Sequence, residues 1–427
     1  MAVTFLQRLA AGRPAPVFVA TGMAGAGVRD ALALDPRIEI VDSPRHANIL
    51  LVDGGVPADQ HEALRRLHDQ LPRPAVSLWY RSDPLVELDH ARRVDRLEEL
   101  PTEAARLHRG LLEGSESGEP GLLPDQPPHP WQGKGEHGQG GEGMMGGVPY
   151  GRPMAMAMME DLRDGLQLDS LSFTLGPFYP ALPPGLQLAL TSQGDLVQMA
   201  MIESSAYPVH LSPLYFEALE RPVSIASLEI ERARYHLYRL THLMRLAGLR
   251  SLAQRTLRDA SGLQPGSRLP HLQRQVTRSG LLNSIDTKLG QLDLQQARML
   301  GGVAWRASGM PNDARSKDPS YARIGFKPLT HEGSDLGARL SQQVAEITQA
   351  LTLAAAADEI GLQTATTEQV ETPRGELSAA HHPTDASHLL KDLLPGLEWS
   401  QALLLIASLD LAALSPYPMA QQEAASC

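Results

Sequence analysis

Three glycines near the start of the chain have types and a spacing that could hold a phosphate. Gly22, Gly25 and Gly27 follow a short apolar segment and precede the helical stretch 28–34. Backbone amides at the start of a helix favour an anion, and Asp42 lies at a sequence distance that suits a ribose hydroxyl. The spacing is G-x-x-G-x-G, whereas dinucleotide sites have G-x-G-x-x-G. We therefore expect a loop of small residues here, with nucleotide binding as the alternative.

A segment rich in glycine and methionine is the second candidate for function. Nine of the nineteen residues from 133 to 151 are glycine. Simple linkers consist of glycine and serine, but this segment also contributes Glu136, His137, Glu142, Met144, Met145, Tyr150 and Arg152. We expect an ordered loop between two domains or against a partner, since methionine makes adaptable apolar contacts. The alternatives are a flexible linker, or a metal site made by the two glutamates and the histidine, which have no recognised spacing.

Charged residues gather in a third segment, around Arg306, Asp313 and Arg315. An unpaired buried charge is expensive, so these residues predict a buried or interfacial ion-pair network. A structural role and a role in proton coupling are both open. On an earlier predicted helix, Arg232 precedes Arg239 by seven positions, and His242 follows three later. This spacing places the three side chains on roughly one face.

Cysteine chemistry is almost absent. The chain contains a single cysteine, Cys427, which excludes a disulfide framework and fits a reducing compartment. Metal sites built from several thiolates are therefore not available within this sequence. The sequence predicts a scaffold without bound metal.

The elements that must position these residues form two domains. Residues 1–112 alternate between apolar strands and helices, which predicts an α/β domain with a parallel, helix-covered sheet. The expected strands are 17–20, 38–41, 49–52 and 75–79, with helices at 28–34 and 62–71. Residues 113–164 form a Pro/Gly linker and the Gly/Met-rich loop.

Residues 165–427 predict a second domain that is mainly α, of the α+β class. Strand-like pieces occur at 171–175, 186–190 and 197–202, and helical periodicity follows at 225–247, 336–357 and 398–409. The apolar run 402–409 is too short to cross a bilayer, so membrane contact is expected only through partners. The net charge of −11 and the lack of a long basic run argue against nucleic-acid binding.

The first domain resembles the small, cluster-binding subunit of nickel–iron hydrogenases and its complex I counterpart. The segment 41–54, V-D-S-P-R-H-A-N-I-L-L-V-D-G, is similar to the pattern S-P-R-x-A-D-x-L-L-V-x-G of those subunits. The resemblance implies a flavodoxin-like parallel sheet with cysteines in the loops after its first and fourth strands. Here those loops are 22–27, which includes Met23, and 79–82, and neither contains cysteine.

The second domain resembles the large hydrogenase subunit, and more closely the quinone-site subunit of complex I. Gly176-Pro177-Phe178-Tyr179-Pro180 is similar to G-P-Q-H-P, and residues 304–315 are similar to x-L-R-A-S-G-x-x-x-D-x-R. Residues 229–243 and 333–339 follow the patterns E-L-x-R-I-x-x-H-L and G-D-x-x-x-R. Tyr179 stands where the resemblance implies a quinone-contacting histidine, and both C-x-x-C pairs of the nickel–iron site are missing.

The resemblance implies a fused peripheral-arm subunit of a complex-I-like or hydrogenase-like membrane oxidoreductase or ion-translocating complex. We expect a peripheral location on the cytoplasmic face of the inner membrane. The expected partners are antiporter-like membrane subunits and other peripheral-arm subunits. The expected role is structural or conformational coupling, with no Fe–S cluster and no nickel–iron site.

Two alternatives remain from the sequence. In the first, the interdomain cavity binds a quinone or nucleotide and supports NADH–quinone oxidoreductase-like redox chemistry, lined by Tyr179, His242, Arg306, Asp313 or Arg315. In the second, the chain is a maturation factor for a true metalloenzyme.

Overall fold

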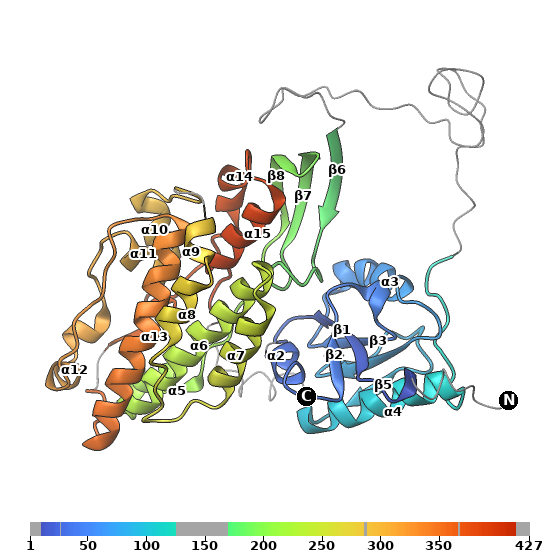
Figure 1. Ribbon diagram of the computed structural model, residues 1–427, viewed down its shortest axis with the longest axis horizontal. Coiled ribbons are helices and arrows are strands. Elements are labelled where there is room, and N and C mark those ends of the chain that lie inside the picture. The colour runs from blue at the N-terminus through green and yellow to red at the C-terminus, as the bar shows by residue number, and fades with distance from the viewer. Residues whose placement is uncertain (1–9, 26, 125–169, 286–287, 366–367, 416–427) are drawn as a thin grey trace.

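The computed structural model describes residues 10–25, 27–124, 170–285, 288–365 and 368–415. Figure 1 shows two domains side by side, an α/β domain followed by a mainly helical domain that begins with a small sheet. The predicted fold class is therefore confirmed as α/β followed by α+β. The candidate residues of the Gly/Met-rich segment, Glu136 to Arg152, and Cys427 lie outside the described residues.

The first domain is built on a five-stranded sheet in the order β2-β1-β3-β4-β5, with every neighbouring pair parallel. The central strand β3 is buried along its whole length, as expected for a parallel sheet with both faces covered. The four predicted strands are present. Their bounds are β1 Ala15–Thr21, β2 Ile38–Ile40, β3 Ile49–Asp53 and β4 Val76–Tyr80, and a fifth strand, β5 Arg92–Val94, was not predicted.

Helices cover both faces of this sheet (Figure 1). Alternate residues of the strands pack against α2 (Val28–Leu32) and α4 (Leu100–Glu113) on one face, and against α3 (His61–Asp69) on the other. Helix α4 was not predicted, although Leu100, Ala104, Leu107 and Leu111 have helical spacing and are all buried. Single 3₁₀ turns occur at Pro44–His46, Ala58–Gln60 and Leu97–Glu99.

The described start of the predicted linker, residues 114–124, is held against the first domain by buried polar contacts. Glu119 accepts hydrogen bonds from the amide and hydroxyl of Ser77 at 2.9 and 2.8 Å, and from His68 Nε2 at 2.9 Å. Asp69 accepts the backbone amides of Leu122 and Leu123 at 2.9 and 2.8 Å. The chain therefore leaves the first domain from a fixed position beside β4 and α3.

Replacing Glu119 by alanine is expected to lower the free energy of unfolding by about 2–3 kcal/mol, because buried donors on Ser77 and His68 lose their acceptor. Urea unfolding followed by circular dichroism measures the change. The exposed Glu113→Ala is the matched control and is expected to shift stability by less than about 0.5 kcal/mol. Equal effects of the two substitutions would show that the Glu119 contacts contribute nothing.

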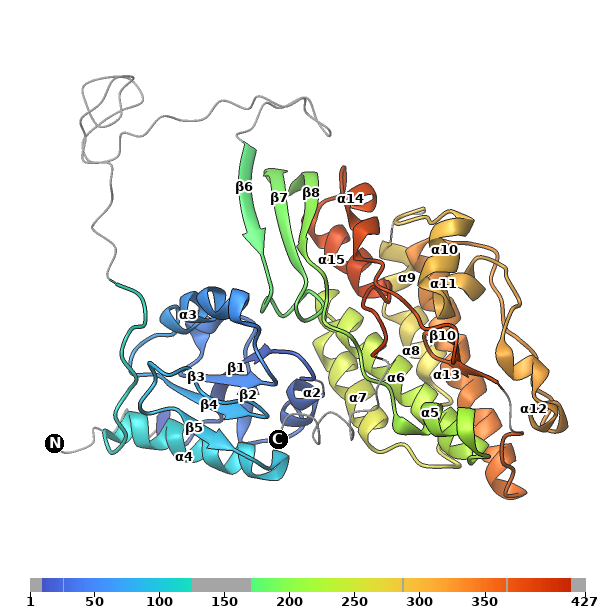
Figure 2. The same cartoon turned by 180° about the vertical axis from the view of Figure 1, so that it is seen from behind.

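The second domain opens with an antiparallel sheet in the order β6-β7-β8. Its inner face packs on the C-terminal helices α14 and α15, as Figure 2 shows from behind. The strands are β6 Ser170–Leu175, β7 Gln187–Gln193 and β8 Leu196–Ser204, and α14 and α15 span Leu390–Leu393 and Trp399–Ser408. The three predicted strands and the predicted helix at 398–409 are confirmed.

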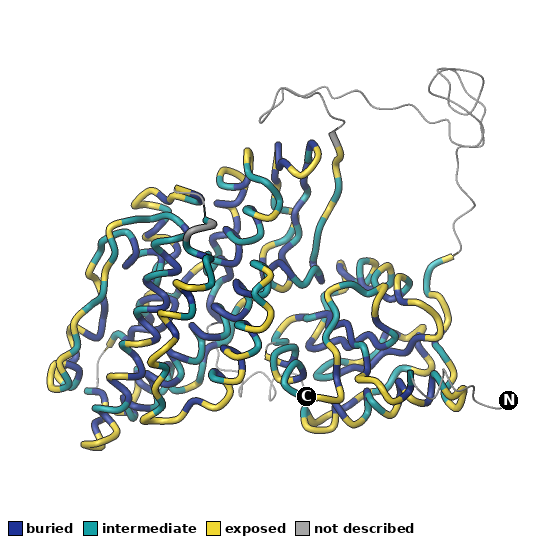
Figure 3. The backbone as a smooth tube through the Cα atoms, in the orientation of Figure 1, coloured by how far each residue is buried: buried dark blue, intermediate teal, exposed yellow. Residues whose placement is uncertain are grey.

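A bundle around two long helices forms the rest of the second domain. Helix α6 (Ile225–Leu246) packs along α13 (Leu336–Glu359) and α7 (Arg250–Ser261) through an apolar cluster of leucines, alanines, isoleucines and valines. Figure 3 shows the buried stripe that these helices turn inward. The predicted helices 225–247 and 336–357 are confirmed. The remaining elements are α5 Pro213–Glu220, α8 Leu272–Arg278, α9 Leu281–Ser284, α10 Leu294–Leu300, α11 Gly302–Ala307, α12 Pro319–Arg323, the hairpin β9 Gln369–Thr372 and β10 Gly375–Ser378, and 3₁₀ turns at Ala314–Lys317 and Ser387–Leu389.

The two domains contact each other through side chains from several elements. Phe178, in the turn after β6, is buried within the apolar cluster of the first domain that α3 covers. Arg245 of α6 pairs with Asp30 of α2 at 2.7 Å, and Gln254 of α7 donates to the Ala33 carbonyl at 2.9 Å. These contacts fix the edge of the first domain that faces α6. Within the described residues, no helix has the length and apolar character needed to span a membrane.

Candidate functional site between the two domains

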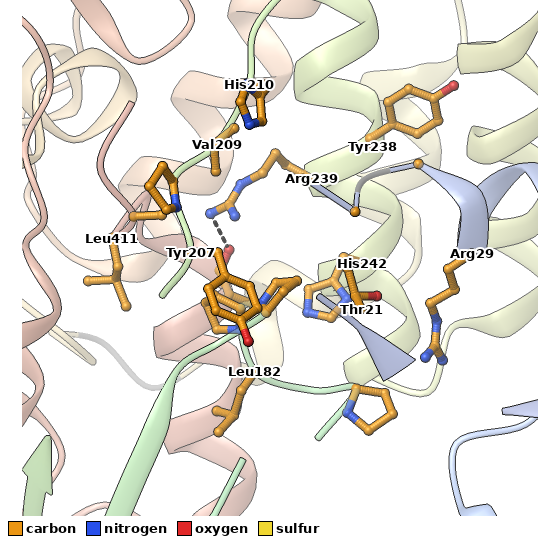
Figure 4. A pocket seen from close by; sticks show the side chains of 18 of the residues that line it. Thr21, Arg29, Leu182, Tyr207, Val209, His210, Tyr238, Arg239, His242 and Leu411 are labelled. Carbon is orange, nitrogen blue, oxygen red and sulfur yellow. Dashed lines mark hydrogen bonds between the residues drawn. The ribbon is translucent and has the colours of Figure 1, made fainter. Parts of the chain in front are cut away.

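A cavity of about 320 Å³ lies where the two domains meet. Its walls come from the β1–α2 loop and α2 of the first domain, and from the turn after β6, the segment 207–210, α6 and the segment 407–412 of the second (Figure 4). Side chains from these distant segments, among them Thr21, Tyr207 and His242, converge in the close-up. The predicted residues Tyr179, His242, Gly22, Gly25 and Gly27 all line this cavity.

The glycine loop of the first domain is shaped by backbone packing against the neighbouring loop. Met23 and Gly55 exchange two backbone hydrogen bonds of 2.7 and 3.1 Å, and the Gly22 amide donates to the Asp53 carbonyl at 2.8 Å. A Cβ atom at Gly22 or Gly25 would clash with the carbonyl oxygens of this neighbouring loop. Glycine at these two positions therefore allows the two loops to pack closely against each other.

Nothing in this geometry favours the nucleotide alternative at the glycine loop. The amides of Gly22 and Met23 are already used within the protein. The helix that begins at Gly27 has only five residues, and Asp42 pairs with Arg29. Asp42 is thus engaged with a guanidinium on the adjacent helix.

Asp53 is the last residue of the central strand β3, where the C-terminal ends of the strands meet. Its side chain is buried, with only 1% exposed. Its carboxylate accepts hydrogen bonds from Arg81, a residue in the left-handed conformation with φ 57°. Burial raises the pKa of Asp53 to about 6, although Arg81 opposes the shift. Asp53 thus binds a proton more readily in the folded chain than in the unfolded one.

The raised pKa of Asp53 predicts a measurable pH dependence. Between about pH 4 and pH 6 the folded protein holds a proton on Asp53 that the unfolded chain has lost, so this group's contribution to stability falls as pH rises. The stability difference between the natural protein and Asp53→Asn should therefore fall by up to about 3 kcal/mol from pH 4 to pH 7. Denaturant unfolding of both proteins across this range measures it, and a constant difference would contradict the assignment.

His242 forms the α6 wall of the cavity. Burial, together with the guanidiniums of Arg239, Arg29 and Arg245, lowers the pKa of His242 to about 4, and a hydrogen bond to the Ala181 backbone opposes the shift. The imidazole is therefore neutral near pH 7. It presents a polar but uncharged group among cations.

The second-domain end of the cavity contains a compact polar cluster. Asp410 accepts from the Tyr235 hydroxyl at 2.7 Å and pairs with Arg239 at 3.2 Å, and Arg374 Nε lies 3.9 Å from the same carboxylate oxygen. Burial would raise the pKa of Asp410, but the two guanidiniums and the tyrosine hydrogen bond outweigh it and lower the pKa. Asp410 is therefore an anion held by two arginines.

The expected network around Arg306, Asp313 and Arg315 is present and buried, but it lies outside this cavity. Arg306 makes a bidentate pair with Glu346 at 2.7 and 2.8 Å and donates to Glu371 at 2.6 Å. Arg315 pairs with Asp313 at 2.7 Å. The network joins α11, α13, β9 and the turn after α11.

Helix α6 supplies the other half of the same network. Glu229 accepts from Arg315 at 3.1 Å and from the Tyr321 hydroxyl at 2.7 Å, and it pairs with Arg232 at 3.3 Å. His236 lies 3.3 Å from Glu346. Among the described residues, the network thus unites three arginines with four carboxylic acids.

The pKa values of the acids and the histidine in this network are shifted in different directions. Burial and the nearby Asp313 raise the pKa of Glu371, whereas Arg306 and His236 outweigh burial and lower the pKa of Glu346. Burial lowers the pKa of His236, so its ring is driven toward the neutral form.

The structure therefore separates residues that the sequence grouped together. Arg306 and Asp313 border a second, polar cleft of about 560 Å³ near β10, and not the cavity that His242 lines. The expectation that they share one cavity with His242 is not met, because Arg306 lies on α11 and Asp313 in the turn after it, whereas His242 lies near the end of α6. Along α6, Arg232 joins the network, while Arg239 and His242 reach the cavity.

Several residues of the cavity were not singled out from the sequence as site residues. They are Arg29, Tyr207, Arg374 and Asp410. Asp410 lies two residues after the end of the apolar helix α15, and Arg374 occupies a tight turn between two strands. Both charged residues stand at the end of a regular element or in a turn between two of them. This position next to a predicted element is the only sequence signal that could have identified them.

Comparison with known proteins gives little beyond this geometry. No protein-family description matches the chain, and no curated protein matches it. Among solved structures, one chain of the membrane-bound sulfane sulfur reductase, an archaeal respiratory membrane complex, is similar. It is 15% identical with a TM-score of 0.39, and the match covers 57% of this chain and 96% of that one. A likeness at this level carries no argument about function.

Proposed function

We propose that this protein is a peripheral-arm subunit of a complex-I-like or hydrogenase-like membrane assembly, where it acts as a metal-free structural or conformational coupling element. The observation that carries the proposal is the edge of the first domain that faces α6. The loops at this edge are the ones in which the resemblance implies cluster-binding cysteines. Here they are closed by backbone pairing between Met23 and Gly55 and by the Arg81–Asp53 pair.

An iron–sulfur cluster does not fit this edge. Such clusters need several thiolates, and the loops 22–27 and 79–82 offer glycine, methionine, alanine, tryptophan, tyrosine, arginine and serine. The docking of the two domains is nevertheless kept, through Phe178 and the Arg245–Asp30 pair. These features support retention of the scaffold for its shape and contacts.

Helix α6 provides a physical route for coupling. Its C-terminal half contacts the first domain and the cavity through Arg239, His242 and Arg245, and its N-terminal half enters the buried network through Glu229 and Arg232. A buried network has discrete arrangements, because each charge must keep a partner. A shift of the first domain at Arg245 would thus be transmitted to Glu229, about four helical turns away along one helix.

Partners and location belong to the same proposal. The protein would bind antiporter-like membrane subunits and other peripheral-arm subunits on the cytoplasmic face of the inner membrane. Membrane fractionation of the native host tests this location. We expect the chain to sediment with the membranes and to be released by alkaline carbonate while integral subunits stay in the pellet. Recovery of the chain only in the supernatant before any wash would contradict the proposal.

A second candidate function is redox chemistry with a quinone or nucleotide bound between the domains. The cavity of about 320 Å³ and its largely apolar lining favour this reading. The purified protein should then carry an extractable cofactor with a characteristic absorbance. A colourless protein that yields no quinone or nucleotide on solvent extraction would exclude it.

A further inference from the structure

The second-domain end of the interdomain cavity has more positive than negative charge. Among the described residues there, one carboxylate, Asp410, serves two guanidiniums. The same Asp410 oxygen also accepts the Tyr235 hydroxyl. The Asp410 carboxylate therefore interacts with three groups. Arg239 and Tyr235 lie closer to it than Arg374 does.

Arg374 is the group left short of a partner. Its side chain is 1% exposed, and its Nη2 donates to the backbone carbonyls of Asp410 and Ala412. Its Nε has no hydrogen-bond partner in the described part of the chain, and the 3.9 Å to Asp410 is too long for a hydrogen bond. A buried guanidinium donor without an acceptor is costly, so this position favours an added anion.

The remaining polar groups of the cavity do not supply that anion. Arg29 is paired with Asp42, and Arg245 is paired with Asp30, so these acids are already used. Burial lowers the pKa of His242, and the guanidiniums of Arg239, Arg29 and Arg245 lower it further. Among the described residues that line the cavity, three are arginines (Arg29, Arg239 and Arg374) and two are acids (Asp30 and Asp410), so cations outnumber anions by one.

The rest of the lining is apolar. Phe178, Leu182, Leu409 and Leu411 contribute to the walls, and the volume of about 320 Å³ lies at the lower end for small-molecule sites. We propose that the interdomain cavity binds an amphipathic organic anion, with its carboxylate between Arg239 and Arg374 and its apolar body along the leucine and phenylalanine walls. This inference is independent of the coupling role. A neutral quinone has no anionic oxygen, so it would leave Nε of Arg374 without a charge-assisted hydrogen bond.

Three probes matched in chain length test the proposal on the purified full-length protein by isothermal titration calorimetry. Octanoate is expected to bind at least about 10-fold more tightly than 1-octanol, because only the carboxylate forms charge-assisted bonds with the arginines. Octylamine is expected to show no binding. Equal affinity for octanoate and octanol would overturn the proposal, and so would the absence of octanoate binding.

Two substitutions with opposite expected signs distinguish the site from a general loss of structure. Arg239→Gln should weaken octanoate binding about 10-fold and leave octanol unchanged. Asp410→Asn removes the competing carboxylate and should strengthen octanoate binding about 5-fold. Arg221→Gln, at an exposed residue just after α5, is the matched control and should change neither affinity. Weakening by Asp410→Asn of a folded protein would overturn the assignment.

If Asp410→Asn does not fold, the comparison of Arg239→Lys with Arg239→Gln provides a second test of the same site. Lysine keeps the charge, so octanoate affinity should stay within about 3-fold of the natural protein, against about 10-fold for Arg239→Gln. Equal losses for the two substitutions would also overturn the proposal. Because these measurements use the isolated protein, a negative result leaves the membrane-partner experiment unaffected.

Discussion

Replacing Arg306 by glutamine is expected to lower the free energy of unfolding by about 3–5 kcal/mol. Arg306 is buried and is the common partner of Glu346 and Glu371, and it lies 3.6 Å from Asp313. Its removal leaves several buried carboxylates without their main counter-charge. Urea unfolding at neutral pH, followed by circular dichroism, measures the loss.

Two further variants make this prediction specific. Arg221→Gln removes an exposed pair with Glu217 and is expected to cost less than about 1 kcal/mol. Adding Glu346→Gln to Arg306→Gln should recover part of the stability, because one unpaired charge is then neutralised. A loss for Arg306→Gln no larger than that of the exposed control would show that the network is not important for stability.

Replacing Phe178 by alanine is expected to separate the two domains. Phe178 belongs to the turn after β6 but packs in the first-domain cluster with Val52, Trp79 and Leu88. Loss of a buried phenylalanine typically costs about 3–5 kcal/mol, and here most of that loss falls on the interdomain contact. Small-angle X-ray scattering should show an increased radius of gyration.

The matched control for this prediction is Phe216→Ala on α5. Phe216 is partly buried within the second domain, so its loss should destabilise that domain without separating the two. An unchanged radius of gyration for Phe178→Ala would contradict the role of this side chain as the interdomain anchor.

The fold could be predicted to a large extent because its signals are local. The apolar runs at 17–20 and 49–52 identify central strands of a parallel sheet, and the periodicity of 225–247 and 336–357 identifies the two long helices. The glycine loop was expected to be compact, and it is. Helix α4 was not predicted, although Leu100, Ala104, Leu107 and Leu111 have helical spacing and are buried.

The candidate site was harder to predict because its contacts join distant segments. Tyr179 and His242 were expected at the cavity and line it, but Arg374 and Asp410 meet Arg239 only through the fold. The charges at Arg306 and Arg315 predicted a network, yet Glu346 and Glu371, which pair with Arg306, and Glu229, which pairs with Arg315, lie on other elements. Sequence spacing identifies which residues need partners and does not identify those partners.

Affinity purification of the tagged chain from detergent-solubilised membranes, with mass spectrometry of the bound proteins, tests the central claim most directly. We expect stoichiometric recovery of antiporter-like membrane subunits together with other peripheral-arm subunits. Recovery of the chain alone, or only with soluble assembly proteins in substoichiometric amounts, would contradict a coupling role and favour a ligand-binding or maturation function.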